Sequence, residues 1–298
     1  MADQDIAEAL HQQAIDLHDK GEDELALQTY HRALELDWAR ADTHYNIGLI
    51  HKYRGEWAES QKHNQYAVQF DPDDEASNWN LAIAATALRD WRTARDVWQR
   101  LGMKIEAGDT PIEADFGTTP VRLNPDENAE VVWARRIDPV RARLLNIPYA
   151  ESGACFGDVV LHDGAAVGYR ERNGREYPVF NVLELFQPST NSTYEARLRI
   201  GDDRDVEDLM ELLDARQIAA EDWSHSVRIL CKQCSEGTPH EHHDQSQTTP
   251  QEPSGERLIA ISGADEAAIR QALADWSNSS RTLLELDCTL AADQFEDG

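Results

Sequence analysis

The stretch ILCKQCSEGTPHEHHDQ, in the C-terminal third of the chain, concentrates side chains that can bind a metal ion. Cys231 and Cys234 lie three positions apart, and His240, His242 and His243 follow shortly after them. A CxxC turn can present two thiolates to one tetrahedral ion, and imidazoles from the returning chain complete the shell. The spacing therefore predicts a structural zinc ion that is held by both cysteines and by two of the three histidines.

Other interpretations of this stretch stay open. Cys231 shares its parity with Val227 and Ile229, as an inward-facing core residue of a strand would. The histidines run into DQSQTTPQEPSG, a composition typical of a solvated linker. A catalytic zinc would need an open coordination position and a carboxylate base, and Glu236 and Glu241 lie nearby, although acidic residues are frequent throughout the chain. A redox-active thiol pair is disfavoured, because no helix follows the CxxC to lower a thiol pKa.

The elements predicted around this stretch give it a place in a fold. Residues 192–200 alternate apolar and polar side chains as a strand does, and residues 205–218 follow with helical spacing. Then come WSHSVRILC and ERLIAIS as strands, ADEAAIRQALADWS as a helix and RTLLELDC as a last strand. This β-α-β-β-α-β order predicts a ferredoxin-like α+β domain over residues 191–298, with an acidic tail. The metal-ligand candidates lie at the end of its second strand and in the long loop 232–255, and loops of this length are usually functional, tethered or disordered.

The middle of the chain has a different composition. Residues 106–128 are dense in Gly, Pro, Asp and Asn and predict a linker with turns. Between residues 129 and 190, short β-rich runs bounded by Pro or Gly predict a small twisted sheet or barrel. These runs are Glu130–Arg135, Arg141–Asn146, Asp158–His162 and Tyr177–Leu185. The phrase NIP…GDVV in this region resembles one seen in uncharacterised bacterial domains, some of which are encoded near toxin systems.

The first hundred residues repeat with a period of 34, so that Gly21 aligns with Gly55 and LELDWA recurs as VQFDPD. Small residues share columns where the two helices of a hairpin must approach closely, and larger residues fill a column between hairpins. The small columns are Ala14, Gly48 and Ala82, and Ala26, Ser60 and Ala94; the larger one is Tyr30, Asn64 and Trp98.

This period and these columns resemble the tetratricopeptide repeat, which pairs two antiparallel helices in each 34 residues. The resemblance implies three repeats, at about residues 7–40, 41–74 and 75–104, in an all-α array over residues 1–105. It also implies a concave groove, lined by the first helix of each repeat, that holds a peptide or a helix. The matching positions are His11, Gln12, Ile15, Tyr45, Asn46, Leu49, Lys52, Trp79, Asn80 and Ile83.

Within this predicted groove, Asn46 and Asn80 occupy one column and could hydrogen-bond a ligand backbone, with Tyr45 and Trp79 as rigid apolar anchors. Whether the rest of the same chain covers the groove stays open at this point.

The charge balance is strongly acidic, with 28 basic against 56 acidic residues and a formal charge of −28. Such a surface repels phosphates, so we expect neither a nucleic-acid nor a membrane partner, and it favours a basic protein, although solubility alone would also account for it. The start MADQDIAEAL lacks the features of a secretory signal, and four cysteines form no disulfide framework. These features predict a cytoplasmic protein.

The sequence thus predicts a multidomain chain, with a helical repeat array followed by an α+β region. We expect a bacterial, non-enzymatic interaction protein that binds a partner segment in the groove, since no glycine-rich phosphate loop, GxSxG or HExxH motif is present. One version is an immunity protein that neutralises a basic toxin. The alternatives are a zinc-dependent enzyme whose repeats recruit substrate and a small-molecule sensor built on the ferredoxin-like domain.

Overall fold

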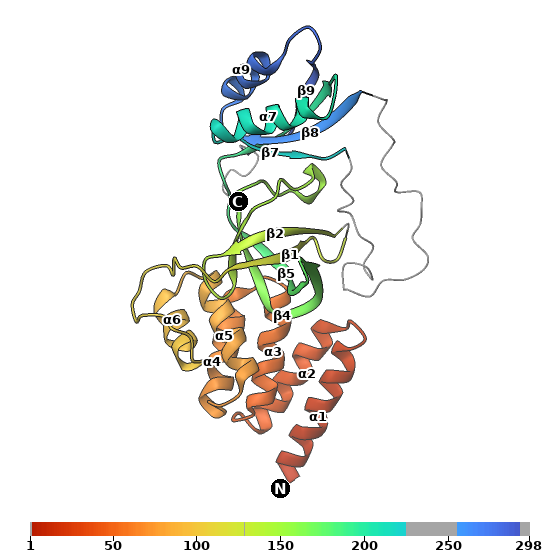
Figure 1. The fold of residues 1–298 in the computed structure, drawn as a ribbon. Helices are drawn as coiled ribbons and strands as arrows, with labels where there is room; N and C mark the ends of the chain where they lie inside the picture. The colour runs from red at the N-terminus through yellow and green to blue at the C-terminus, as the bar shows by residue number, and fades with distance from the viewer. Residues whose placement is uncertain (1, 128, 225–254, 293–298) are drawn as a thin grey trace. The chain divides into compact units, whose positions relative to one another are not determined.

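The computed structural model describes residues 2–127, 129–224 and 255–292 of the chain. It divides into two compact units, Met1–Glu113 and Ala114–Gly298. In the described residues the first unit is helical, and the second contains a closed five-stranded barrel and a four-stranded sheet with two helices (Figure 1). The predicted architecture, an all-α array followed by an α+β region, is confirmed.

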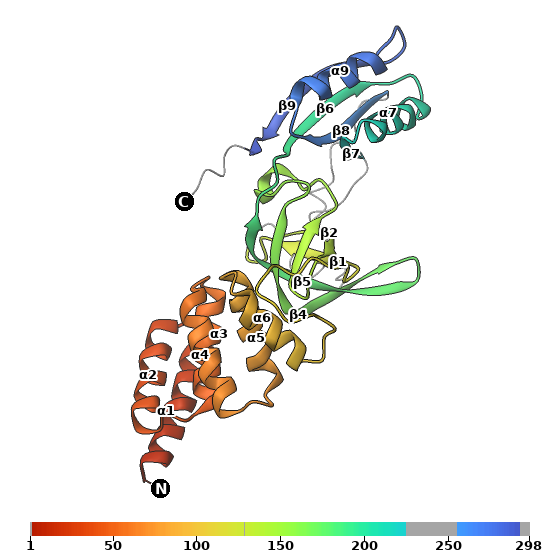
Figure 2. The ribbon, with the colours of Figure 1, turned by 90° about the vertical axis from the view of Figure 1, so that its left-hand side faces the viewer.

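Six helices form three antiparallel hairpins in the first unit (Figure 2). They are α1 (Ala2–His18), α2 (Asp23–Leu36), α3 (Ala41–Tyr53), α4 (Trp57–Phe70), α5 (Glu75–Ala87) and α6 (Trp91–Arg100). The turn inside each hairpin has a left-handed residue at the same point of the 34-residue period, namely Gly21 (φ 76°), Gly55 (φ 70°) and Arg89 (φ 59°). Glycine adopts this conformation freely, whereas a side chain makes it strained. The third hairpin therefore keeps the turn geometry although it has lost the glycine.

The repeat columns form the interior of this array. At Gly48, α3 lies close to α4, and Ser60 Oγ donates to the carbonyl of Gly48 at 2.9 Å. A Cβ atom at Gly48 would lie 2.5 Å from Asn64 Nδ2, so these two helices need a glycine at this position to pack as they do. The other members of the columns are also buried: Ala14, Ala26, Ala82, Ala94, Tyr30 and Trp98.

The barrel in the second unit consists of five strands in sequential order. They are β1 (Thr118–Leu123), β2 (Glu130–Arg136), β3 (Arg141–Leu144), β4 (Val159–Arg172) and β5 (Arg175–Gln187). Neighbouring strands are antiparallel, and a parallel pairing of Val121 with Phe180 closes the barrel between β1 and β5. Inward-facing apolar residues such as Val132, Ala134 and Leu144 form its core.

A buried ion pair holds the tight turn between β2 and β3. Arg141 Nε donates to Asp138 Oδ2 at 2.5 Å, and the two side chains are 3% and 0% exposed. The other carboxylate oxygen of Asp138 accepts from the backbone amides of Val140 at 2.8 Å and Arg141 at 2.5 Å. The carboxylate therefore satisfies both the guanidinium and the turn backbone.

The strands differ from the sequence prediction in two places. β1 lies inside residues 106–128, which the sequence predicted to be linker and turns. The predicted runs Asp158–His162 and Tyr177–Leu185 cover only parts of one long hairpin, which β4 and β5 form. Its turn is Asn173–Gly174, with φ of 55° and 73°. Asn-Gly with both residues left-handed is the preferred pair for a two-residue type I′ hairpin turn.

The second sheet has the predicted ferredoxin-like order. Its elements are β6 (Ser192–Arg199), α7 (Arg204–Ala215), β7 (Ala219–Asp222), β8 (Glu256–Gly263), α9 (Glu266–Trp276) and β9 (Thr282–Leu290). The spatial order β7-β8-β6-β9 is antiparallel throughout, and α7 and α9 cover one face over a core that includes Leu198, Leu209 and Leu273. β7 begins four residues before the predicted strand WSHSVRILC, most of which lies outside the described residues.

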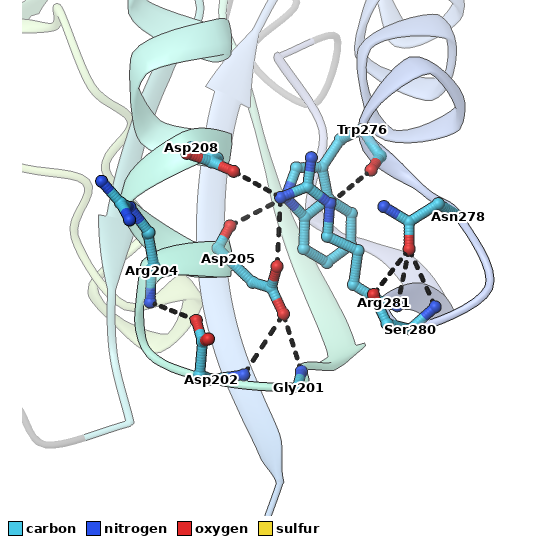
Figure 3. A network of polar contacts seen from close by, with 9 residues as sticks. All are labelled: Gly201, Asp202, Arg204, Asp205, Asp208, Trp276, Asn278, Ser280 and Arg281. Atoms are coloured by element: carbon cyan, nitrogen blue, oxygen red, sulfur yellow. Dashed lines mark hydrogen bonds and ion pairs between the residues drawn. The ribbon is translucent and has the colours of Figure 1, made fainter.

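Arg281 joins the start of α7 to the end of α9 (Figure 3). Its Nη1 lies 3.1 Å from Asp205 Oδ1 and 2.6 Å from Asp208 Oδ2, and its Nε donates to the carbonyl of Trp276 at 2.8 Å. Asp205 in turn accepts from the amide of Gly201 at 2.7 Å. These bonds fix the relative position of the two helices on the sheet.

The barrel and the four-stranded sheet contact each other. Glu221 Oε1, on β7, accepts from Asn146 Nδ2 at 2.7 Å and from the amide of Ile147 at 3.2 Å. Next to it, Ile147 and Trp223 pack with Ala260 in a buried cluster. In the part of the chain that the structure describes, no helix is long and apolar enough to cross a membrane.

Candidate partner-binding groove

The first helices of the three hairpins carry the ten positions predicted to line the groove. Hydrogen bonds link these helices to one another: His11 Nδ1 and Thr43 Oγ1 lie 2.8 Å apart between α1 and α3. Lys52 Nζ donates to Asn80 Oδ1 at 3.1 Å between α3 and α5. These bonds join α1 to α3 and α3 to α5, and they involve three of the ten predicted positions, His11, Lys52 and Asn80. We call the ten positions the groove row.

The ten residues differ in their exposure. Gln12 is exposed. The half-buried members are Ile15, Tyr45, Asn46, Leu49 and Trp79. The buried members are His11, Lys52, Asn80 and Ile83, with 6%, 3%, 5% and 1% exposure. The half-buried residues have part of their side-chain surface exposed, while the buried ones pack inside the array.

Each of the two asparagines of the shared column interacts with a side chain of the preceding repeat. Asn46 lies next to the hydroxyl of Tyr30, and burial, helped by the charge of Asp19, raises the pKa of Tyr30 to about 12 although Asn46 acts to lower it. Asn80 accepts from Lys52, as described above. Of these two amides, the half-buried Asn46 is the one with surface for a ligand backbone, and the buried Asn80 supports the groove row.

Trp79 is held in place by a second aromatic ring. Its ring centroid lies 4.9 Å from that of Trp98, at an interplanar angle of 71°. Trp98 is fully buried and supports the ring of Trp79. Trp79 itself is half-buried, so part of its ring is exposed. A rigid, partly exposed aromatic side chain of this kind suits an anchoring role at an interface.

Four histidines gather beside this row, a cluster that the sequence analysis did not detect. They come from α2, α3 and α4, and the ring centroids of His31, His44 and His51 lie 5.8, 5.2 and 6.2 Å from that of His63. The Nδ1 atoms of His44 and His63 are 3.1 Å apart. His44 Nε2 lies 3.0 Å from the carbonyl of Trp38, which can only accept. The hydrogen of the neutral His44 ring is therefore on Nε2. Its Nδ1 accepts a hydrogen bond from the Nδ1–H group of His63.

The environment lowers the pKa of three of these rings, His31, His44 and His63. His44 is 0% and His63 3% exposed. Burial, followed by the field of His44, lowers the pKa of His63 to about 3, and burial also lowers the pKa of His44 and of His31. Among the described residues, no group of three or more His, Cys, Asp or Glu side chains has an arrangement that could hold a metal ion. At the centre of the cluster, the buried His44 and His63 are thus neutral imidazoles that pack against each other.

The predicted zinc ligands cannot be placed in the same way. Their positions fall within residues 225–254, outside the described residues. They are Cys231, Cys234, His240, His242 and His243.

In the second unit, Cys155 and Asp158 are the described side chains that most resemble a nucleophile with an acid beside it. Burial, together with the charge of Asp158, raises the pKa of the Cys155 thiol to about 11, so the reactive thiolate is disfavoured at neutral pH. Asp158 accepts from the amides of Cys155 at 2.8 Å and Ser189 at 2.6 Å. Both residues therefore have structural roles in this loop.

Comparison with known proteins identifies one part of the chain. A search of curated proteins finds no match. A family model described as TPR repeat matches residues 16–55, which run from α1 to the turn after α3. The matched helices lie within three hairpins whose turns and small-residue columns repeat with the same period. The N-terminal unit is therefore a tetratricopeptide-repeat-like helical array, in which residues 16–55 match the repeat.

Proposed function

We propose that the repeat array holds a segment of a partner protein along α1, α3 and α5. Tetratricopeptide repeats mediate protein–protein interaction, and three hairpins are enough to form a continuous surface. The observation that carries the proposal is the row of half-buried residues, Tyr45, Leu49 and Trp79, beside the half-buried Asn46. Apolar side chains of the partner contact the row, and its backbone bonds to the amide of Asn46.

The partner that fits best is a basic protein. A formal charge of −28 attracts a cationic molecule over long range and speeds its association. An immunity protein that neutralises a basic toxin in the bacterial cytoplasm is the specific version that this charge and the NIP…GDVV resemblance support. Its association would weaken steeply with ionic strength, because rim charges act mainly on the association rate.

Site-specific photo-crosslinking in cells would test the groove. A photoreactive residue at Gln12, Tyr45 or Leu49, on the first helices, is expected to give one shared protein adduct. The same residue at the exposed Gln28 or Gln69, on the second helices, should not. Equal adducts at all five positions would contradict the proposal. An intramolecular adduct to residues 114–298 would instead show that this chain covers its own groove.

We also propose that Cys231, Cys234 and two of the three nearby histidines bind a structural zinc ion. The support is the CxxC spacing and the soft ligand set, which suits a tetrahedral zinc ion. Plasma mass spectrometry on the untagged protein is expected to find near-stoichiometric zinc. The metal and part of the thermal stability should be lost together in Cys231→Ser/Cys234→Ser, because bound metal stabilises the folded state. Loss of zinc with unchanged stability would favour the zinc-enzyme alternative, and zinc-free protein would overturn the site.

A further inference from the structure

One face of the β4–β5 hairpin is basic and aromatic, in a chain that is otherwise strongly acidic. The hairpin extends beyond the barrel (Figure 2). Its register pairs Arg170 with Tyr177 and Arg172 with Arg175 across the two strands. Because side chains alternate along a strand and paired residues share a face, these four side chains lie on the same side of the hairpin.

Two of these arginines are stacked on aromatic rings. The guanidinium carbon of Arg172 lies 5.0 Å from the ring centroid of Trp133, on β2, and that of Arg175 lies 5.1 Å from the ring of Tyr177. Trp133 and Tyr177 meet edge to face, with centroids 5.0 Å apart and an interplanar angle of 86°. The four side chains therefore form one row, Arg172–Trp133–Tyr177–Arg175, which we call the arginine–aromatic row.

Within the part of the chain that the structure describes, the two guanidinium groups of this row have no anionic partner. Among the described residues, no carboxylate lies within ion-pair distance of Arg172 or Arg175, and both side chains are exposed. Like charges directly opposite each other on a sheet are destabilising. The aromatic ring supports one face of each guanidinium group, and the N–H groups at its edge stay available to a ligand. An arginine in this geometry can bind a carboxylate through two parallel hydrogen bonds.

An open cavity adjoins the row. It has a volume of about 550 Å³ and is lined by Trp133, Leu145, Asn146, Glu171 and Arg172. Leu145 is 40% exposed and forms an apolar wall together with Trp133. Glu171 would repel an acidic side chain from the cavity itself, so the cavity suits an apolar side chain next to acidic ones.

We propose that the arginine–aromatic row binds an acidic segment of a partner protein, with Asp or Glu carboxylates on Arg172 and Arg175 and an apolar side chain in the cavity. The row lies on the barrel and is independent of the repeat array, so it is a second interaction surface of opposite charge preference to the first. A bound carboxylate also relieves the repulsion between the two opposed arginines.

A single-stranded nucleic acid fits this surface less well. Such ligands are held by stacking bases on open aromatic faces. Here Trp133 and Tyr177 each have a guanidinium over the ring and contact each other edge to face. The formal charge of −28 also repels a ligand that has one phosphate per nucleotide more strongly than it repels a short peptide with a few carboxylates.

Fluorescence anisotropy on the full-length protein tests the proposal. The probe is a labelled synthetic peptide of about twelve residues that repeats Glu-Asp-Leu. Binding at low salt is expected to weaken by about tenfold or more in Arg172→Ala/Arg175→Ala, since charge-assisted hydrogen bonds are lost. Arg172→Lys/Arg175→Lys should give an intermediate loss, because lysine keeps the charge but loses the stacked, two-pronged geometry.

A matched control is Arg32→Ala/Arg199→Ala, which removes two exposed arginines elsewhere and should leave the affinity within about twofold. Circular dichroism shows whether each variant is folded, and the lysine variant remains informative if the alanine variant is not. Absence of peptide binding, or an equal loss in the control, would overturn the proposal. Tighter binding of a labelled oligothymidine that depends on the same two arginines would overturn it in favour of a nucleic-acid surface.

Discussion

The Asp138→Ala variant is expected to lose about 3–5 kcal/mol of the free energy of unfolding, because it leaves the buried guanidinium of Arg141 without its carboxylate. The pair is almost completely inaccessible to solvent, at 0% and 3% exposure, so water cannot replace the missing partner. The backbone amides of Val140 and Arg141 lose their acceptor at the same time. Urea denaturation at pH 7, followed by circular dichroism, measures the loss.

The control for this variant is Asp115→Ala. Asp115 pairs with Arg135 at 2.5 Å, but the two side chains are 58% and 57% exposed. Exposed ion pairs contribute about 0–1 kcal/mol, so this variant should be close to wild type. If both substitutions cost the same, burial is not what gives the Asp138–Arg141 pair its effect.

The second large effect is a loss of stability in mild acid that depends on His63. The pKa of its side chain is about 3 in the folded array and about 6.5 in an unfolded chain. Between these values the unfolded state binds more protons, so the stability contribution is complete above pH 6.5 and falls as the pH decreases toward 3. From pH 6.5 to 5 we expect a loss of about 2 kcal/mol through this group.

The charges around His63 mostly act in the same direction. After burial, which is the largest cause, a positive charge on His44, His31, Lys62 or His51 would further disfavour its protonation. Glu59 opposes them weakly, since its carboxylate is half-exposed and lies 4.0 Å from His63 Nε2. A proton on His63 would also leave a buried cation against the neighbouring imidazole of His44.

Urea denaturation between pH 5 and 8 would measure this effect by comparing wild type with His63→Gln. The variant is expected to be less stable at pH 8 but to have a flatter dependence on pH. His18→Gln is the matched control, because His18 is partly exposed and pairs with Asp23 at 2.7 Å on the surface. His162, in the barrel, also has a pKa lowered to about 4 by burial, so the difference between variants isolates His63. A pH dependence that His63→Gln leaves unchanged would contradict the assignment.

The repeat array could be predicted almost entirely from the sequence because its packing is local and periodic. Ala14, Gly48 and Ala82 share a column for a steric reason that the structure shows directly at Gly48. The turn at Arg89 was harder to detect, since the glycine expected there is missing and only the period indicates it.

The barrel could be predicted only in part, because it closes through contacts that are distant in the sequence. β1 contains a proline and follows a Gly- and Pro-rich stretch, so its residues resemble a linker until β5 pairs with them. The hairpin of β4 and β5 did have a local signal, Asn173–Gly174, that would have joined two predicted short strands into one motif. With that hairpin in register, the alignment of Arg172 with Arg175 follows from the sequence.

The repeat period predicted which residues lie on the first helices, but it did not predict how deeply each of them is buried. Lys52 and Asn80 were expected to face a ligand, and the structure shows them bonded to each other. The histidine cluster had a weak signal, since His31, His44, His51 and His63 fall within one repeat length. Their convergence depends on how three helices pack, which single-helix periodicity does not specify.

The closure of the barrel has a consequence for the order of folding events. Thr119 on β1 donates to the carbonyl of Pro178 on β5, a contact between residues 59 positions apart. The helical hairpins form from neighbours in the chain, and such local contacts assemble far faster than a pairing that must first close a long loop. During synthesis, the array is therefore expected to be complete before β5 has left the ribosome, and until then β1 can pair with β2 but not with β5.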